Sequence, residues 1–357
     1  MSILSKILKV TAILAGVVVI GGAVTCIAAK KINNKTPDGG INETGFIDIN
    51  GTKQWVNIYG QNMDAPVLLY LHGGPFGATS YIDWTCLRKL SKDYIVVNWD
   101  QRGCGHNYPD YKESKAPTSE TMMQDGREMT DYLIKRFGRE KITLMGHSWG
   151  SVLGSNLVLE NPEKYDAMIA LSLVADIEES QKLFKEYMLE KTADDPELHA
   201  LAEKIDPSVW NTEKQKDSMP LMMKYSYNDN FFKDADINFY TSFLFNPYCR
   251  LSESIRMMLG SKDYNEYTEN ILRPDAAAVI VPLQLSGKTE YKVPYYIVEG
   301  REDHGDIMMA EEAAAYYEKI TAPDKEMIYL DGGHNAPFMK TEELAEFVHK
   351  IAEKNKK

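Results

Sequence analysis

The 357-residue sequence predicts an α/β protein built on a mostly parallel central sheet. Two observations lead to this expectation. Residues 66–71 and 94–99 are continuous apolar runs, which suit strands buried on both faces, as parallel strands are. From residue 118 onwards, apolar runs alternate with stretches of helical spacing, which is the order of elements in βαβ units.

The individual elements follow from local signals. A β-hairpin is expected at residues 46–58, because Asn50-Gly51 separates two short strand-like segments. Further strands are predicted at 142–145, 167–174, 295–298 and 327–330. Helices are predicted at 118–137, which Gly138 stops, and at 151–159, 308–320 and 341–350.

The alternation is interrupted at residues 176–292, which are helical in character and rich in methionine and aromatic residues. This stretch is interpreted as a helical cap inserted between two parts of the core, residues 41–175 and 293–357. Most of its large apolar side chains are expected to form the cap's own core. Some should line an apolar pocket, since ligands bind at the carboxyl ends of the strands in open α/β sheets.

Composition excludes some classes of function. The net charge is −12, and no Lys/Arg-rich face is apparent, which argues against nucleic acid as a partner. The four cysteines (Cys26, Cys86, Cys104 and Cys249) are scattered and show no metal-ligand spacing. No metal, organic cofactor or disulfide framework is therefore expected, and no protein partner is inferred.

The amino terminus differs from the rest of the chain. Residues 10–29 carry no charge across 20 positions, and a helix of that length spans about 30 Å, the thickness of a bilayer core. A short basic segment (1–9) precedes this run, and a polar linker (30–40) follows it. We expect a single-pass transmembrane anchor, with the amino terminus inside and the folded domain outside the cytoplasm.

A cleaved signal peptide is the alternative for this segment. Its apolar region would run over roughly 7 to 15 residues and end at a good small-x-small site. The run here is longer, and the best late candidate, at residues 26–28, is a mediocre site. These two points favour the anchor.

The most specific motif is Gly-His-Ser-Trp-Gly at residues 146–150, between a predicted buried strand and a predicted helix. It matches the G-x-S-x-G nucleophile elbow of the α/β-hydrolase fold in its required context. A sharp strand-to-helix turn strains the backbone of Ser148, and only small residues at Gly146 and Gly150 leave it room. Ser148 is therefore the candidate nucleophile.

A serine hydroxyl needs a base to remove its proton, and the base needs a carboxylate to orient it. His334 follows the last predicted strand in a glycine-rich loop and is the candidate base. Asp303 follows the strand that resumes after the cap, so the chain order is Ser, Asp, His. Glu302 and Asp306 are close enough to remain rivals of Asp303.

Acyl transfer also requires donors for an oxyanion, and backbone amides usually supply them. The amide of Trp149, directly after the nucleophile, is one candidate. The second is Gly74 in the loop His-Gly-Gly-Pro at residues 72–75, where the missing Cβ lets the backbone approach a substrate.

With residues 72–75 (HGGP), 100–105 (DQRGCG), 146–151 (GHSWGS) and 300–303 (GRED) in order, the chain resembles the proline iminopeptidase family of α/β-hydrolases over about residues 41–350. The resemblance implies Ser148, Asp303 and His334 as a triad, oxyanion donors in the HGGP loop, and short peptides with a free amino terminus as substrates. In that family the DQRGCG segment has a largely structural and pocket-shaping role.

Two departures from the family pattern concern the substrate. Phe76 follows Pro75, where further glycines are usual. The family also holds the substrate's ammonium with a cap glutamate, and the nearest segment here, residues 236–240, has no clear match. Glu178, Glu179, Asp234 and Asp236 are possible substitutes, although each is more typical of a solvated surface charge.

The sequence therefore predicts a serine hydrolase that acts through an acyl-enzyme, foremost an aminopeptidase similar to proline iminopeptidases. A carboxylesterase, amidase or lipid-directed hydrolase would use the same machinery and is the main alternative. A non-catalytic binding member of the fold is a further alternative, which the intact Ser148, Asp303 and His334 set disfavours.

Overall fold

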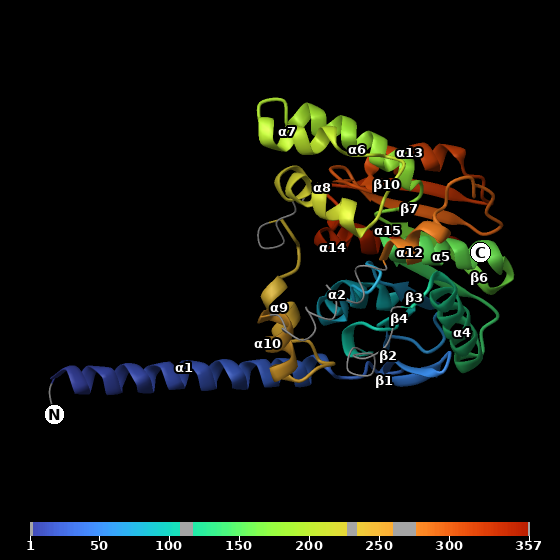
Figure 1. The fold of residues 1–357 in the computed structure, drawn as a ribbon. Helices are drawn as coiled ribbons and strands as arrows, with labels where there is room; N and C mark the ends of the chain where they lie inside the picture. The colour runs from blue at the N-terminus through green and yellow to red at the C-terminus, as the bar shows by residue number, and fades with distance from the viewer. Residues whose placement is uncertain (1–2, 108–116, 227–233, 260–275, 356–357) are drawn as a thin grey trace.

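The computed structural model describes residues 3–107, 117–226, 234–259 and 276–355. Its centre is an eight-stranded sheet in the order β1-β2-β4-β3-β5-β6-β7-β10 (Figure 1). The strands are β1 (Ile41–Ile49), β2 (Thr52–Gly60), β3 (Val67–Leu71), β4 (Ile95–Trp99), β5 (Ile142–His147), β6 (Tyr165–Leu171), β7 (Tyr295–Gly300) and β10 (Lys325–Leu330). β8 (His304–Gly305) and β9 (Met308–Met309) form a separate two-stranded ribbon.

The pairing confirms the expected mostly parallel sheet. β1 pairs with β2, and β2 with β4, in antiparallel fashion, while every other neighbouring pair is parallel. The hairpin forms at Asn50-Gly51, whose φ angles are 47° and 73°. Two consecutive positive φ angles belong to a type I′ turn, which Asn-Gly favours and which matches the twist of paired strands.

Helices cover both faces of the sheet. α4 (Ser119–Phe137), α5 (Trp149–Glu160) and α13 (Ala310–Lys319) pack on one face, and α2 (Ser80–Leu87) and α15 (Thr341–Asn355) on the other. β3 shows why its residues must all be apolar. Leu69 and Leu71 belong to one core cluster, whereas Leu68 and Tyr70 belong to the other. Successive strand residues point to opposite faces, so each β3 side chain is buried.

The predicted boundaries of the central strands hold closely, and other elements differ. β1 and β2 begin before the predicted hairpin strands, at Ile41 and Thr52, and α15 runs to Asn355 rather than to residue 350. α5 begins at Trp149, directly after the elbow, rather than at residue 151. β6 spans Tyr165–Leu171 and not 167–174, because Ser172 has a φ of 47° that ends the extended conformation. The elements that were not predicted include α2, the short α14 (Ala336–Met339) and the ribbon strands β8 and β9.

The cap segment enters the sequence between β6 and β7. Its helices are α6 (Ile177–Lys191), α7 (Pro196–Glu203), α8 (Thr212–Tyr225), α9 (Phe239–Leu244), α10 (Leu251–Leu259) and α12 (Ala276–Ile280). A small core of its own holds α6, α7 and α8 together, with Phe184, Met188, Leu221 and Met222 buried in it. Met309 of β9 joins this core and ties the segment 176–292 to the sheet domain.

α1 (Ile3–Asn33) projects away from the body of the molecule (Figure 1). Its window Gly16–Asn33 has a mean hydropathy of 1.4 and is long and apolar enough to cross a membrane, a test that a signal sequence also passes. The helix continues through residues 30–33, where the linker was expected to begin. Its end contacts the cap: Lys30 Nζ donates to the carbonyl oxygens of Asn246 (2.6 Å) and Cys249 (3.1 Å).

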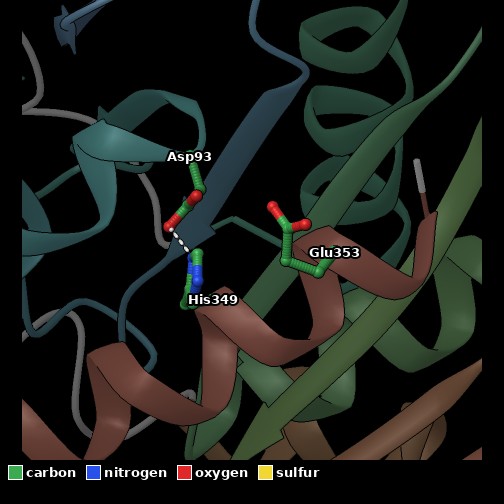
Figure 2. A group of neighbouring side chains, drawn as sticks. All are labelled: Asp93, His349 and Glu353. Atoms are coloured by element: carbon green, nitrogen blue, oxygen red, sulfur yellow. Dashed lines mark hydrogen bonds and ion pairs between the residues drawn. The ribbon is translucent and has the colours of Figure 1, made fainter.

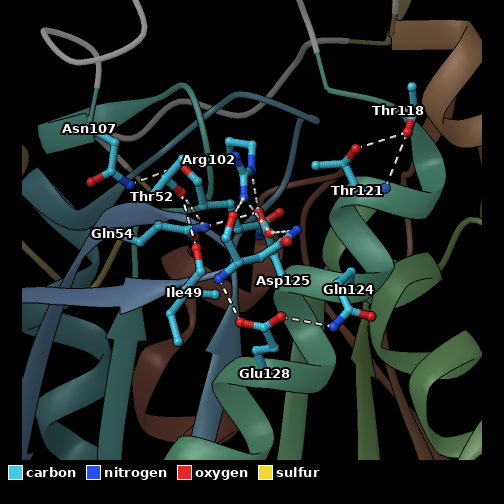
Figure 3. Close-up of polar contacts among 12 residues, drawn as sticks. Ile49, Thr52, Gln54, Arg102, Asn107, Thr118, Thr121, Gln124, Asp125 and Glu128 are labelled. Atoms are coloured by element: carbon cyan, nitrogen blue, oxygen red, sulfur yellow. Dashed lines mark hydrogen bonds and ion pairs between the residues drawn. The ribbon is translucent and has the colours of Figure 1, made fainter.

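A buried polar cluster joins the hairpin to α4 (Figure 3). The Asp125 carboxylate, on α4, receives two hydrogen bonds from Arg102, at 2.6 Å from Nε and 2.7 Å from Nη2. It also accepts from the side-chain amides of Asn50 (2.8 Å) and Gln54 (3.0 Å). Arg102 of the DQRGCG segment therefore helps to hold the β1–β2 hairpin against α4. This agrees with the structural role expected for that segment.

Candidate active site

The strand-to-helix turn between β5 and α5 holds Ser148 in a strained conformation, with φ 53° and ψ −119°. Glycines on either side make the turn possible. A Cβ on Gly146 would lie 2.1 Å from the Gly150 carbonyl oxygen, and a Cβ on Gly150 would lie 2.0 Å from the Leu71 carbonyl oxygen. No other residue fits either position. The strained backbone of Ser148 therefore lies at the point where its side chain projects from the end of β5.

His334 and Asp303 come together from two loops at the same edge of the sheet. His334 follows β10 and Asp303 follows β7, and Nδ1 of His334 lies 2.6 Å from Oδ2 of Asp303. Asp303 is only 2% exposed. Since Nδ1 donates to the carboxylate, Nε2 is the nitrogen that remains to exchange a proton with a substrate or a nucleophile.

The loop that carries His334 is fixed through its backbone. The His334 carbonyl oxygen accepts hydrogen bonds from Ser172 Oγ (2.8 Å) and from His147 Nε2 (3.0 Å). Neither residue was singled out from the sequence as a partner of His334. Their hydrogen bonds to His334 join segments that are far apart in the chain, so no local sequence pattern predicts them.

The two rivals of Asp303 are placed differently. Asp306 is fully buried, and its Oδ2 accepts from the indole Nε1 of Trp210 at 3.0 Å, so this carboxyl links the loop after β7 to the cap. Burial raises the pKa of Asp306 to about 6. Glu302 is exposed at the surface. Of the three acids, Asp303 is the one that accepts the hydrogen bond from Nδ1 of His334.

The loop after β3 carries Gly74, whose φ is 129°. A Cβ there would lie 2.6 Å from the amide nitrogens of both Phe76 and Gly77, so the turn requires glycine. His72 anchors the start of the loop: its Nδ1 donates to the Gly73 carbonyl (2.7 Å) and its Nε2 accepts from the Gln101 amide (3.0 Å). Burial lowers the pKa of His72, which agrees with this neutral tautomer.

Gln101 connects the two segments that carry the candidate oxyanion donors. Its side-chain Nε2 donates to the His72 carbonyl oxygen (3.1 Å), and its Oε1 accepts from the indole Nε1 of Trp149 (2.9 Å). Trp149 is the first residue of α5, and first-turn amides have no partner within their own helix. The side chain of Gln101 therefore holds the Gly74 loop and the start of α5 in a fixed relation.

A cavity of about 310 Å³ opens over this edge of the sheet, and both Ser148 and His334 line it. Its walls come from the core and from the segment 176–292, which supplies Trp210, Gln215, Met219, Ala276 and Ile280. The lining from the core is mostly apolar apart from Ser148 and His334: Gly74, Pro75, Phe76, Gly77, Trp149, Val152, Val174, Ile307 and Met308. Among the residues that the structure describes, no carboxylate lines the cavity.

The four acids considered for binding an ammonium group lie elsewhere. Asp236 caps α15, accepting from Thr341 Oγ1 (2.7 Å) and from the amide of Glu342 (3.0 Å). Glu178 and Glu179 pair with Lys182 on the surface of α6. Asp234 is exposed.

One group of possible metal ligands lies away from this site. Figure 2 shows Asp93, His349 and Glu353, whose ligand atoms all lie within 4.8 Å of one another. Asp93 precedes β4, so the group sits at the opposite edge of the sheet from the Ser148 cavity. Nδ1 of His349 is 2.9 Å from Oδ2 of Asp93, and an ordinary hydrogen bond accounts for this contact.

Comparison with known proteins decides the family. The model of the alpha/beta hydrolase fold matches residues 66–341, which include Ser148, Asp303 and His334. The chain belongs to the α/β-hydrolase family. This assignment agrees with the strand order, the elbow and the cap described above.

More specific relatives match in part. A probable aminopeptidase, YbaC, of Bacillus subtilis (strain 168) is 30% identical over 146 residues, covering 40% of this chain and 45% of the relative. The proline iminopeptidase of Heyndrickxia coagulans is 29% identical over 127 residues, covering 35% of this chain and 41% of the relative. The chain thus spans less than half the length of these curated relatives.

Among solved structures, the proline iminopeptidase of Mycobacterium smegmatis superposes with a TM-score of 0.59. The superposition covers 88% of this chain and 98% of that structure, at 16% sequence identity. At this identity the likeness establishes the fold alone, and the reaction has to be argued from the site.

Proposed function

We propose that this α/β-hydrolase is a serine hydrolase in which Ser148 is the nucleophile, His334 the general base and Asp303 the acid that orients it. The observation that carries this proposal is that Ser148 and His334 line one cavity while Nδ1 of His334 is bound to a buried Asp303. A strained serine at a strand-to-helix turn is the arrangement that exposes a nucleophile in this fold.

The reaction proceeds in two halves. In the first, Ser148 Oγ attacks the substrate carbonyl and its proton passes to Nε2 of His334, while the amides of Gly74 and Trp149 donate to the oxyanion. His334 then protonates the leaving group, which departs and leaves an acyl-enzyme. In the second half, water attacks the acyl group, gives its proton to His334 and releases Ser148.

The first candidate substrate is a short peptide with a free amino terminus, which would make the protein an aminopeptidase similar to proline iminopeptidases. The sequence resemblance and the partial matches to an aminopeptidase and a proline iminopeptidase support this proposal. Hydrolysis of proline p-nitroanilide and other aminoacyl anilides tests it directly. Ser148→Ala is the blank, and loss of activity on acetylated anilides would show that the free amino group is recognised.

The second candidate is an esterase or amidase for neutral acyl groups, or a lipid-directed hydrolase. The described lining of the cavity favours it, because apolar side chains dominate and the four candidate cap acids lie at the surface. Short p-nitrophenyl esters measure this activity in the same assay. Turnover of esters without turnover of free-amino anilides would assign the chain to this class and reject the aminopeptidase.

We also propose that α1 is an uncleaved membrane anchor for a core of residues 41–175 and 293–357 and a cap of residues 176–292. The apolar length of α1 supports this proposal. The contact of Lys30 with the cap also supports it, because cleavage at residues 26–28 would remove the helix that precedes Lys30. Full-length protein should stay in the membrane pellet after a high-salt wash. Recovery of an amino-terminally shortened protein in the supernatant would instead establish a cleaved signal.

A further inference from the structure

The carboxyl end of α1 is docked on the cap through Lys30. The Lys30 ammonium donates to three oxygen atoms of the cap. They are the carbonyl oxygens of Asn246 (2.6 Å) and Cys249 (3.1 Å) and Oγ of Ser254 on α10 (3.0 Å). An ammonium group has three N–H donors, so these contacts satisfy Lys30 completely. The end of α1 is therefore held against the cap by hydrogen bonds.

The part of the cap that receives α1 is itself fixed to the core through α2. Indole Nε1 of Trp84, on α2, donates to the Ser242 carbonyl oxygen of α9 at 2.8 Å. The side-chain amide of Asn246 donates to the carbonyl oxygens of Ser80 (3.1 Å) and Tyr81 (3.0 Å) at the start of α2. These contacts set the direction in which α1 leaves the catalytic domain.

The docked turn is the end of the apolar run of α1. Residues 10–29 carry no charge, and Lys30 closes the run. Cys26, one turn before Lys30, is buried, whereas Val24 and Ile27 are exposed, and α1 contacts α10. A helix rises about 1.5 Å per residue, so Cys26 lies only about 6 Å from Lys30 along the axis. In an anchor whose run of 20 residues crosses the hydrocarbon core, these contacts lie where the core meets the headgroups.

The helices at this level expose apolar side chains. Figure 1 shows α10 beside α1, with α9 next to it, on the side of the molecule from which α1 projects. Tyr240 of α9 is 53% exposed and Ile255 of α10 is 39% exposed, while Phe239 and Phe243 of α9 are half-buried. We call these four side chains the anchor-side face. Tyrosine in particular suits the membrane–water boundary, because its ring is apolar and its hydroxyl is polar.

We propose that the anchor-side face lies in the headgroup layer of the membrane that α1 crosses, so that the catalytic domain lies on the bilayer in one orientation. The inference rests on the proposed membrane anchor. Contact with lipid removes the exposed apolar side chains from water. The docking of Lys30 brings the face to the same depth in every molecule, which makes the bilayer the occupant that this face meets first.

The test measures lipid contact of the full chain in vesicles of phosphatidylcholine and phosphatidylglycerol. A fluorophore is attached to Tyr240→Cys or Ile255→Cys, both at exposed positions where substitution costs little stability. Lipids with a nitroxide near the headgroup quench a fluorophore that touches them. The four native cysteines are buried, and the unsubstituted chain treated in the same way gives the background.

Val281→Cys is the matched control. Val281 is 37% exposed and directly follows α12, which lies on the side of the molecule away from the projecting part of α1 (Figure 1). We expect nitroxide lipids to cause loss of fluorescence at Tyr240→Cys and Ile255→Cys and none above background at Val281→Cys. Equal quenching at all three positions would show that the domain has no fixed orientation and would overturn the proposal.

Two further outcomes separate this proposal from the anchor itself. Unquenched labels at both positions, in protein that stays in the membrane pellet after a high-salt wash, would overturn the lipid contact and leave the anchor intact. Recovery of the protein in the supernatant would overturn the anchor, and this proposal with it.

A second copy of the chain is the other occupant that an apolar face could take. Energy transfer between donor-labelled and acceptor-labelled Ile255→Cys molecules in the same vesicles measures it. Transfer that persists on dilution with excess lipid, without quenching by nitroxide lipids, would assign the face to a dimer and overturn the proposal. Transfer that falls on dilution, with quenching retained, is the result we expect.

Discussion

Nδ1 of His334 lies 2.6 Å from Oδ2 of Asp303, and this contact joins the loops that follow β10 and β7. Asp303→Asn is expected to lower kcat by roughly 10⁴-fold, because an amide in place of the carboxylate favours the wrong tautomer of the imidazole and stabilises no imidazolium. Steady-state kinetics on the best substrate would measure it. Circular dichroism should show that the fold is unchanged.

Asp306→Asn is the matched control for that prediction. Asp306 is as buried as Asp303, but its carboxylate accepts from Trp210 of the cap at 3.0 Å. Its replacement is expected to change KM more than kcat, since it alters the wall of the cavity and not the base. A loss of kcat as large as that of Asp303→Asn would make Asp306 the orienting acid instead.

Gln101 is expected to act on the rate through the two loops that it connects. Gln101→Leu removes the acceptor for Trp149 Nε1 and the donor for the His72 carbonyl, so the oxyanion donors lose their fixed spacing. A drop in kcat of about tenfold is expected, smaller than the 10² to 10³ of losing a donor outright. Gln101→Glu retains the acceptor and should lose less. Unchanged kcat in Gln101→Leu would contradict this role.

The cluster around Asp125 is expected to matter for stability and not for chemistry. Asp125→Ala leaves the Arg102 guanidinium without its buried partner, which typically costs about 3–5 kcal/mol in the free energy of unfolding. Denaturant titration measures this loss. Lys182→Ala, which breaks exposed pairs with Glu178 and Glu179, should cost far less, because solvent screens exposed ion pairs. Equal losses in the two variants would contradict the argument.

The raised pKa of the buried Glu312 carboxyl makes the stability of the fold depend on pH. Burial raises its pKa from 4.5 to about 8, so between these values the folded state holds a proton that the unfolded state has released. The folded state binds more protons there, and stability falls as pH rises through this range. Glu312→Gln should therefore lose less Tm than wild type between pH 5 and pH 8. Glu318→Gln, exposed on the same helix, should behave as wild type does.

The parts of the site that sequence could predict are those in which short-range geometry dictates residue type. A Cβ at Gly146 or Gly150 would lie near 2 Å from a backbone carbonyl oxygen, so both positions require glycine. The elbow can therefore be recognised as a sequence motif, which makes Ser148 the candidate nucleophile. The chain order of strands places Asp303 and His334 at the same sheet edge. The hairpin could be predicted for the same reason, because few residue pairs other than Asn-Gly adopt the two positive φ angles found at Asn50 and Gly51.

What sequence could not provide depends on contacts between distant segments. Ser172 and His147 hold the His334 loop through hydrogen bonds to the His334 carbonyl oxygen. The pairing of Lys30 with the cap left no pattern at all.

The most direct test of the central claim is to label the protein with a fluorophosphonate, which reacts with activated serines, and to locate the adduct by peptide mass spectrometry. We expect one adduct, on the peptide that contains Ser148, together with loss of turnover, and neither labelling nor turnover in Ser148→Ala. An adduct on a different serine, or full turnover by Ser148→Ala, would contradict the assignment of Ser148 as the nucleophile.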